Sequence, residues 1–286
     1  MIISLLQSRE LIIKAELVID LDYPRKKARY FTFNGDRHDI KSGQTIQVTS
    51  DRSTDTHMIR VPDKLIENTS VGDRLVLGDG ELLLPVRQIN ENILATESLN
   101  DWFVSDGRGI SVIGKGFLID NSQLVFDHSI KTKLLLEANS HALSFVENEH
   151  DISNWRKQYP HTTIWSKIES KQGVDNIGDI ARVSDAIIIA RGDLVLQMPP
   201  GSLDSSEEQL ISNANSYHKV IYLGTEVLSF MVTRSFPTRA EISGIMSFLD
   251  KAKFPGILLT KESSYSFEVL KKSLDAISKI LELKWK

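Results

Sequence analysis

The chain has 286 residues, of which 41% are hydrophobic and 25% are charged, and its formal net charge is −4. This size allows one large hydrophobic core and a smaller one. The negative net charge leaves no basic field for nucleic acid, and the lack of cysteine excludes disulfides, thiolate zinc sites and thiol catalysis. The first residues carry no basic leader and are interrupted by Gln7, Arg9 and Glu10, so we expect neither a signal peptide nor a membrane span, but a cytoplasmic protein.

A short apolar run, Leu17 to Asp20, predicts a buried parallel strand. From about Lys26 to Ile113 the pattern changes to alternation with Gly-Asp and Asp-Gly turns, which is typical of a small all-β domain. We therefore expect residues 26–113 to form an inserted β-barrel-like domain, and residues 1–25 and 114–286 to form the domain that it interrupts.

Strands and helices alternate again after Gly114. The expected strands lie at residues 142–146, 163–167, 186–190, 220–224 and 256–260. Apolar residues then recur at spacings of three and four, as on one face of a closing helix: Phe267, Leu270, Leu274, Ile277 and Leu281. With the first run, six strands alternate with helices, which predicts an α/β fold, an incomplete TIM (β/α) barrel with an inserted all-β domain.

Charged motifs follow two of these strands, where a barrel collects its catalytic groups. Glu169 and Asp193 are expected to converge on one mouth, and a pair of carboxylates suits magnesium; two solvated carboxylates that cap helices are the alternative. Lys167 lies two residues before Glu169 and so points to the same side of its strand. Its ammonium could neutralise a phosphoryl group or an enolate oxygen, or pair with the two carboxylates.

Two further candidates bind or protonate a substrate. Arg191, Gly192 and Asp193 lead into a short helix, whose free backbone amides could hold a carboxylate, unless the glycine only forms a turn. Thr225 follows the next strand; its hydroxyl could relay a proton together with water, or cap a helix.

These motifs resemble pyruvate kinase. Four of its signatures occur in order over about eighty residues, which makes coincidence improbable. They are the Lys-Ile-Glu strand end at 167–169, the Ala-Arg-Gly-Asp-Leu strand end at 190–194, Thr225, and the Pro-Thr-Arg-Ala-Glu helix start at 237–241. The segment 20–24 resembles the strand that precedes the family's mobile β-domain. The segment 77–80 resembles a turn within that domain.

The resemblance implies a barrel of the phosphoenolpyruvate/pyruvate superfamily and a role for each site residue. It makes Lys167 and Thr225 catalytic, and it makes Glu169 and Asp193 ligands of magnesium or manganese. The residues that it implies for substrate binding are Arg191, Gly192, Asp193 and Thr225. Asp20 remains from the family's monovalent-cation site.

Several departures from the family pattern affect the nucleotide side of the site. The Arg-x-Asn-x-Ser-His-Gly motif is missing, and we expect the first two β/α units and the C-terminal domain to be missing too. Leu21 replaces a cation-binding threonine, which argues against potassium, and Lys27 replaces an arginine that helps to hold phosphates. Glu147 replaces an arginine that the family has near the mouth of the barrel, and Val195 replaces a glycine of the family. The pyruvate side is therefore expected to be intact and nucleotide binding to be impaired.

Three functions follow. The first is magnesium-dependent phosphoryl transfer between phosphoenolpyruvate and ADP, impaired in the isolated chain. The second is a magnesium-dependent lyase or decarboxylase that acts on a 2-oxo acid through its enolate, and the third is a non-catalytic binding or regulatory homologue. Each takes a small molecule like pyruvate, with no nucleic-acid or membrane partner. Open strand edges predict an oligomer or a complementary partner chain.

Overall fold

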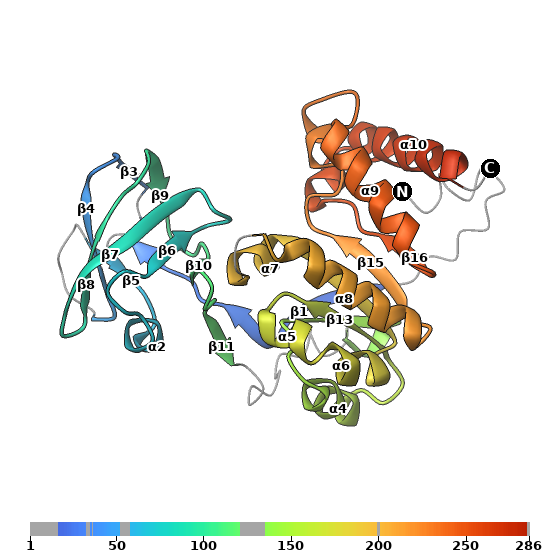
Figure 1. Ribbon diagram of the computed structural model, residues 1–286, viewed down its shortest axis with the longest axis horizontal. Helices are drawn as coiled ribbons and strands as arrows, with labels where there is room; N and C mark the ends of the chain where they lie inside the picture. Colours follow the sequence, from blue (N-terminus) through green and yellow to red (C-terminus); the bar gives the residue numbers. More distant parts are fainter. Residues whose placement is uncertain are drawn as a thin grey trace.

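The computed structural model describes residues 17–32, 35, 37–51, 58–120, 135–198 and 201–284. In this part of the chain, two seven-stranded sheets and a two-stranded ribbon form two regions that lie side by side (Figure 1). One hydrophobic core contains Trp155 and Ile187, and another contains Leu75 and Leu84. Each large sheet therefore has its own core. Residues 1–16, within the expected segment 1–25, lie outside the described residues.

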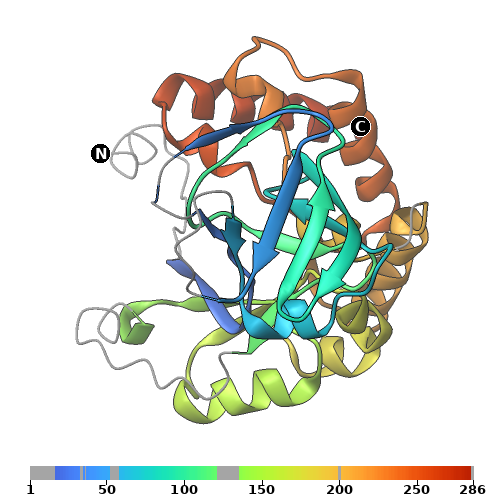
Figure 2. The same ribbon diagram turned by 90° about the vertical axis from the view of Figure 1, so that its left-hand side faces the viewer.

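The first sheet contains six parallel strands in sequence order. They are β1 (Val18–Lys27), β12 (Ser140–Ser144), β13 (Thr163–Ile168), β14 (Ala186–Ala190), β15 (Val220–Gly224) and β16 (Pro255–Ile257). The helices that follow these strands, green to red in Figure 2, lie around the sheet behind the blue and cyan strands of the second sheet. This arrangement confirms the expected incomplete TIM barrel.

Helices and short 3-10 turns follow the strands of this sheet. They are α4 (Glu149–Gln158), α5 (Lys171–Asp175), α6 (Ile177–Val183), α7 (Arg191–Gln197), α8 (Leu203–Ser216), η1 (Ser229–Val232), α9 (Arg239–Lys251), η2 (Lys261–Ser264) and α10 (Phe267–Lys284). Two helices begin with a capping box, at Asn148 and at Thr238, which satisfies free amides of the first turn. Outward-facing strand residues such as Ile187 and Ile189 share the core with these helices.

The second sheet has the order β10-β6-β7-β8-β4-β5-β2 and is antiparallel except for the pair β4 and β5. Its strands are β2 (Phe31–Thr32), β4 (Thr45–Thr49), β5 (Met58–Arg60), β6 (Arg74–Leu77), β7 (Leu82–Asn90), β8 (Ile93–Glu97) and β10 (Ile110–Val112). A ribbon of β3 (His38–Ile40) with β9 (Trp102–Val104) and the short helix α2 (Asp63–Glu67) complete the region. Leu82 and Leu84 are both buried, as the alternation predicts.

Two strands join the regions. β1 continues through Lys27, and β11 (Leu118–Asp120) pairs with it antiparallel, Lys27 opposite Leu118. Both lie between the two sheets in Figure 1. The inserted region is thus tied to the barrel at the carboxyl end of the first parallel strand.

Four expected strands have different bounds: β1 runs on to Lys27, β13 includes Ile168, and β12 and β16 both begin and end earlier than expected. β12 ends at Ser144, because Phe145 has a left-handed backbone (φ 49°) that a strand cannot contain. β16 ends at Ile257, although the amide of Leu258 still bonds to the carbonyl of Leu223 at 3.0 Å. Beyond it the chain turns into η2, so the eighth barrel position is shorter than the apolar run suggests.

None of the helices in the described ranges is long and apolar enough to cross a membrane.

Candidate functional site

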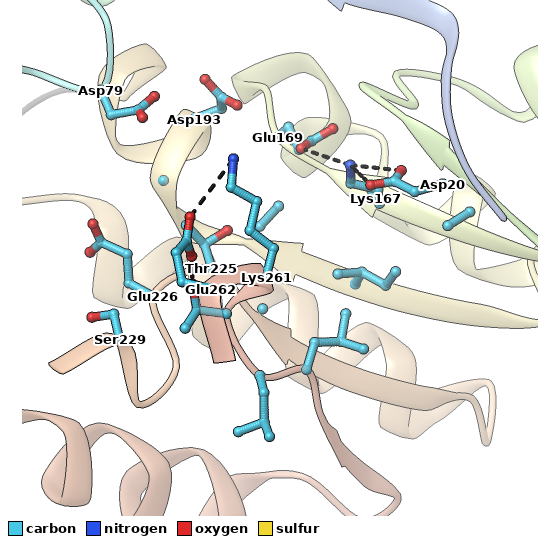
Figure 3. Close-up of a pocket in the computed structure, with 18 of the residues that line it drawn as sticks. Asp20, Asp79, Lys167, Glu169, Asp193, Thr225, Glu226, Ser229, Lys261 and Glu262 are labelled. Atoms are coloured by element: carbon cyan, nitrogen blue, oxygen red, sulfur yellow. Dashed lines mark hydrogen bonds and ion pairs between the residues drawn. The ribbon is translucent and has the colours of Figure 1, made fainter. Parts of the chain in front are cut away.

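A pocket of about 1050 Å³ lies at the carboxyl ends of the parallel strands (Figure 3). The structure brings most of the predicted site residues together in its wall: Asp20, Lys167, Glu169, Gly192, Asp193 and Thr225. Because parallel strands end at the same edge of a sheet, residues as far apart in the sequence as Asp20 and Thr225 meet here.

Lys167 is the centre of an ion-pair cluster. Its Nζ atom lies 3.0 and 3.1 Å from the two carboxylate oxygens of Asp20 and 3.5 Å from Oε1 of Glu169, and it donates to the hydroxyl of Ser144 at 3.1 Å. Burial opposes the charge of the ammonium, but the carboxylates outweigh burial and raise the pKa of Lys167. The lysine is therefore a fixed cation, paired with Glu169 as the sequence predicts but with Asp20 in place of Asp193.

Glu169 is the most buried carboxylate of the pocket. Burial, together with the charge of Asp193, raises its pKa to about 7, although Lys167 opposes the shift. The amide of Phe145 donates to Oε2 at 2.8 Å and orients the group. Near neutral pH this carboxyl group can lose or take up a proton.

The loop that supplies this amide is held by Arg25 of β1. Its Nη1 atom donates to the carbonyl oxygen of Phe145 at 3.3 Å and to Oδ2 of Asp151 at 2.6 Å, and its Nε atom lies 3.0 Å from Oε2 of Glu147. Glu147 was expected to reverse a charge near the mouth. Instead, its charge is balanced by Arg25 in a largely buried ion pair.

Asp193 stands in the first turn of α7, and its Oδ1 atom lies 2.8 Å from Nζ of Lys27. Asp79, from the turn between β6 and β7, lines the pocket on the same side (Figure 3). The inserted region thus reaches the site.

The donor set fits magnesium or manganese. Glu169 and Asp193 offer carboxylate oxygens, and such an ion takes one or two protein carboxylates and leaves its other positions to water and substrate. No cluster of three or more acidic or histidine ligands exists in the described ranges, so the fit rests on this pair alone.

Gly192 and Thr225 are in direct contact. A Cβ atom at residue 192 would lie 2.6 Å from Cγ2 of Thr225, so the glycine makes room for the threonine. Thr225 is exposed in the pocket with φ 63°, and Glu226 with φ 54° follows it. The helix-cap alternative for Thr225 is wrong, because the next helical turn, η1, is preceded by Leu228. Such strained backbone often occurs at functional sites.

Arg191 lies outside the pocket wall. Its Nε atom is 3.9 Å from Oε1 of Glu207 on α8, and its guanidinium lies near Gly244 of α9. The side chain is thus placed to join helices. The structure thus does not bring the side chain of Arg191 together with the other predicted site residues.

Sequence reasoning missed Lys261 and Glu262 at the start of η2, and Glu226 and Ser229 after β15, all of which line the pocket. Lys261 extends toward the pocket centre and lies 3.8 Å from Oε1 of Glu262 (Figure 3). Their position directly after the last two strands is the signal that could have found them. Below the charged groups, Trp165 lines an apolar floor and stacks on Tyr222 with ring centroids 4.5 Å apart.

A curled parallel sheet, a polar pocket at its carboxyl ends and an inserted all-β region define a barrel protein with an enzyme-like site. The chain matches the family "Pyruvate kinase, barrel domain" over residues 3–264. It belongs to the pyruvate kinase family, as its motifs predict.

Relatives with established names agree with this membership. The chain is 28% identical to a pyruvate kinase of Thermotoga maritima over 92% of its own length and 57% of the relative's. It is 29% identical to a pyruvate kinase of Thermoplasma acidophilum, over 87% of its length and 44% of the relative's. The chain therefore spans about half the length of the curated relatives it matches.

Solved structures show the same fold. A pyruvate kinase from Cryptosporidium parvum superposes with a TM-score of 0.79 at 24% identity, over 98% of this chain and 59% of that one. A pyruvate kinase from Pyrobaculum aerophilum gives a TM-score of 0.79 at 20% identity, over 98% of this chain and 62% of that one.

Proposed function

We propose that the pocket stabilises the enolate of pyruvate with magnesium or manganese, in phosphoryl transfer between phosphoenolpyruvate and ADP that is impaired in the isolated chain. One observation carries the proposal: the fixed ammonium of Lys167 lies in the same pocket as Glu169, Asp193 and Thr225. Family membership adds the substrates as an expectation.

Each residue has a defined task in this proposal. Lys167 neutralises the enolate oxygen or the phosphoryl group in transit without moving a proton. Glu169 and Asp193 would hold the ion, which when bound supplies positive charge to substrate oxygens. Thr225 relays a proton to the enolate carbon through water, since its hydroxyl alone has no useful pKa. Lys261 is placed to attract the substrate's carboxylate or phosphate.

The charge balance of the pocket is a further reason to expect weak kinase activity, beside the departures from the family's nucleotide-side residues. Of the described residues that line it, two carry an ammonium group, Lys167 and Lys261. Six carry a carboxylate: Asp20, Asp79, Glu169, Asp193, Glu226 and Glu262. Nucleotide phosphates would meet net negative charge, which opposes their binding.

Potassium is not expected to help. Both oxygens of Asp20 already accept hydrogen bonds from Lys167, and Leu21 offers no side-chain oxygen. A monovalent cation at Asp20 would have to compete with an ammonium that is part of the same chain.

The excess of carboxylates over ammonium groups in the pocket also favours a second function, action on a 2-oxo acid without nucleotide. Two assays separate the functions. Exchange of the methyl protons of pyruvate with D₂O in the presence of Mg²⁺, followed by NMR, reports enolate formation. A coupled assay of pyruvate formation from phosphoenolpyruvate and ADP reports phosphoryl transfer. We expect proton exchange with little phosphoryl transfer. Ordinary kinase turnover by the pure chain would contradict the impairment. If the chain shows neither activity, the binding or regulatory role is the remaining function.

We propose that the chain works as an oligomer or with a complementary chain. β11 pairs with β1 only at residues 25–27, and within the described ranges no strand pairs with the outer edge of β16. Unpaired backbone groups on apolar strands favour association. Light scattering of the full chain, alone and mixed with a protein that carries the family's first two barrel strands, tests this; a lone monomer in both samples would contradict it.

A further inference from the structure

Lys27 links three groups around the rim of the site. Its Nζ atom lies 2.8 Å from Oδ1 of Asp193 in the barrel, donates to the carbonyl oxygen of Gly78 at 3.1 Å, and lies 3.7 Å from Oδ1 of Asp79. Gly78 and Asp79 belong to the turn of the inserted region. The lysine side chain is 13% exposed, whereas that of Asp79 is 84% exposed. The ammonium is therefore held in place between the two regions.

The backbone around Lys27 is shaped to hold its side chain. A Cβ atom at Gly109 would lie 2.9 Å from both Cδ and Cε of Lys27, so the glycine before β10 leaves room for the lysine in this conformation. Gly78 has φ 68°, which L side chains rarely adopt, and its carbonyl accepts from the ammonium. Gly78 after β6 and Gly109 before β10 therefore flank the side chain that β1 supplies.

We propose that Lys27 is an internal counter-ion of the metal site, which a divalent ion has to displace from Asp193. This inference rests on the proposed metal site at Glu169 and Asp193. An ammonium and a divalent cation on one carboxylate repel each other strongly in a partly buried pocket. Once displaced from Asp193, Lys27 keeps its partners on the insert, Gly78 and Asp79. The ion pair that links the turn at residues 78–80 to α7 through Lys27 is then lost.

Two measurable consequences follow. Lys27 lowers the affinity of the site for divalent ions, because each binding event breaks its ion pair. Binding of the ion also loosens the turn at residues 78–80 relative to the barrel. Neither effect requires turnover.

The test is Mn²⁺ binding to the full chain, measured by calorimetry or by the EPR signal of free Mn²⁺. We expect Lys27→Met to bind Mn²⁺ roughly tenfold more tightly than the wild type, as removal of an adjacent positive charge predicts. Lys26→Met is the matched control, since it removes the same charge from the opposite side of the strand; its affinity should stay within about twofold. Hydrogen exchange at residues 78–80 of the wild type should rise when Mn²⁺ is added.

The outcomes separate the inference from the metal site. If Mn²⁺ binds wild type and Lys27→Met with equal affinity, or the variant more weakly, the metal site stands and the counter-ion role is refuted. If Mn²⁺ binds neither protein, the metal site and the inference both fail. The exchange experiment uses the wild type alone, so unchanged exchange at saturating Mn²⁺ refutes the displacement even if Lys27→Met does not fold.

Discussion

The amide of Phe145 donates a hydrogen bond to Oε2 of Glu169 at 2.8 Å, so the end of β12 orients a carboxylate that follows β13. The φ of 49° at Phe145 helps to direct this amide, and Arg25 holds the carbonyl of the same residue. A side chain of the proposed metal site is thus positioned by a neighbouring strand and by Arg25 at the start of the insert.

Glu169→Gln should stabilise the metal-free protein at pH 8. The folded-state pKa of about 7 exceeds the ordinary 4.5, so the wild type becomes less stable as pH rises between these values, when Glu169 must ionise in a buried site. We expect the variant to be more stable by about 1–3 kcal/mol at pH 8 and equal near pH 4.5. Urea unfolding measures the difference, and Glu282→Gln, an exposed change on α10, is the control. A variant less stable than wild type at pH 8 would contradict the raised pKa.

The affinity for Mn²⁺ should depend on pH through the same group. The ion binds the ionised carboxylate, so affinity should rise about tenfold per pH unit below pH 7 and level off above it. Calorimetry between pH 5.5 and 8.5 follows the profile. Glu169→Gln should bind weakly at every pH; tight, pH-independent binding by this variant would place the ion elsewhere.

Gly192→Ala should damage catalysis more than metal binding. The added methyl group would meet Thr225, whose hydroxyl is proposed to relay the proton, whereas no atom of Glu169 is among its three nearest neighbours. We expect pyruvate proton exchange to fall at least about tenfold and the affinity for Mn²⁺ to change little. Gly244→Ala on α9, where the nearest atom would be 3.6 Å away, is the control. Equal loss of both properties would mean that the glycine only supports the fold.

His141 should make the barrel core sensitive to acid. Its Nδ1 atom accepts from Nε1 of Trp155 at 2.9 Å, and Nε2 lies 2.9 Å from the carbonyl oxygen of Leu135. Burial lowers the pKa of His141, so its contribution to stability is present above the unfolded value near 6.5 and is lost as pH falls below it. His141→Gln should cost about 1–3 kcal/mol at pH 7.5 and less at pH 5. Urea unfolding at both pH values checks this; a cost that does not shrink in acid would contradict it.

Most strands and helices of the barrel could be predicted from the sequence, because the patterns that indicate them lie within short stretches of residues. β14 and β15 have the predicted bounds, since each is a continuous apolar run bounded by charged or flexible residues. The motif around Lys167 and Glu169 places both side chains on one side of a strand, and only the strand's own geometry is needed to infer that. The closing helix follows equally from its apolar spacing.

The sequence by itself determined the order of strands and helices, the insertion and the identity of the charged residues at the strand ends. Only the tertiary structure decided which charges meet: Arg25 with Glu147 across 122 positions, Lys27 with Asp193 across 166, and Lys261 in the pocket wall. Periodicity fixes which face of an element is buried, but it carries no information about the distance between the ends of separate elements. Those distances, which set the pKa of Glu169 and the partners of each carboxylate, arise when the sheet curls and the insert is docked beside it.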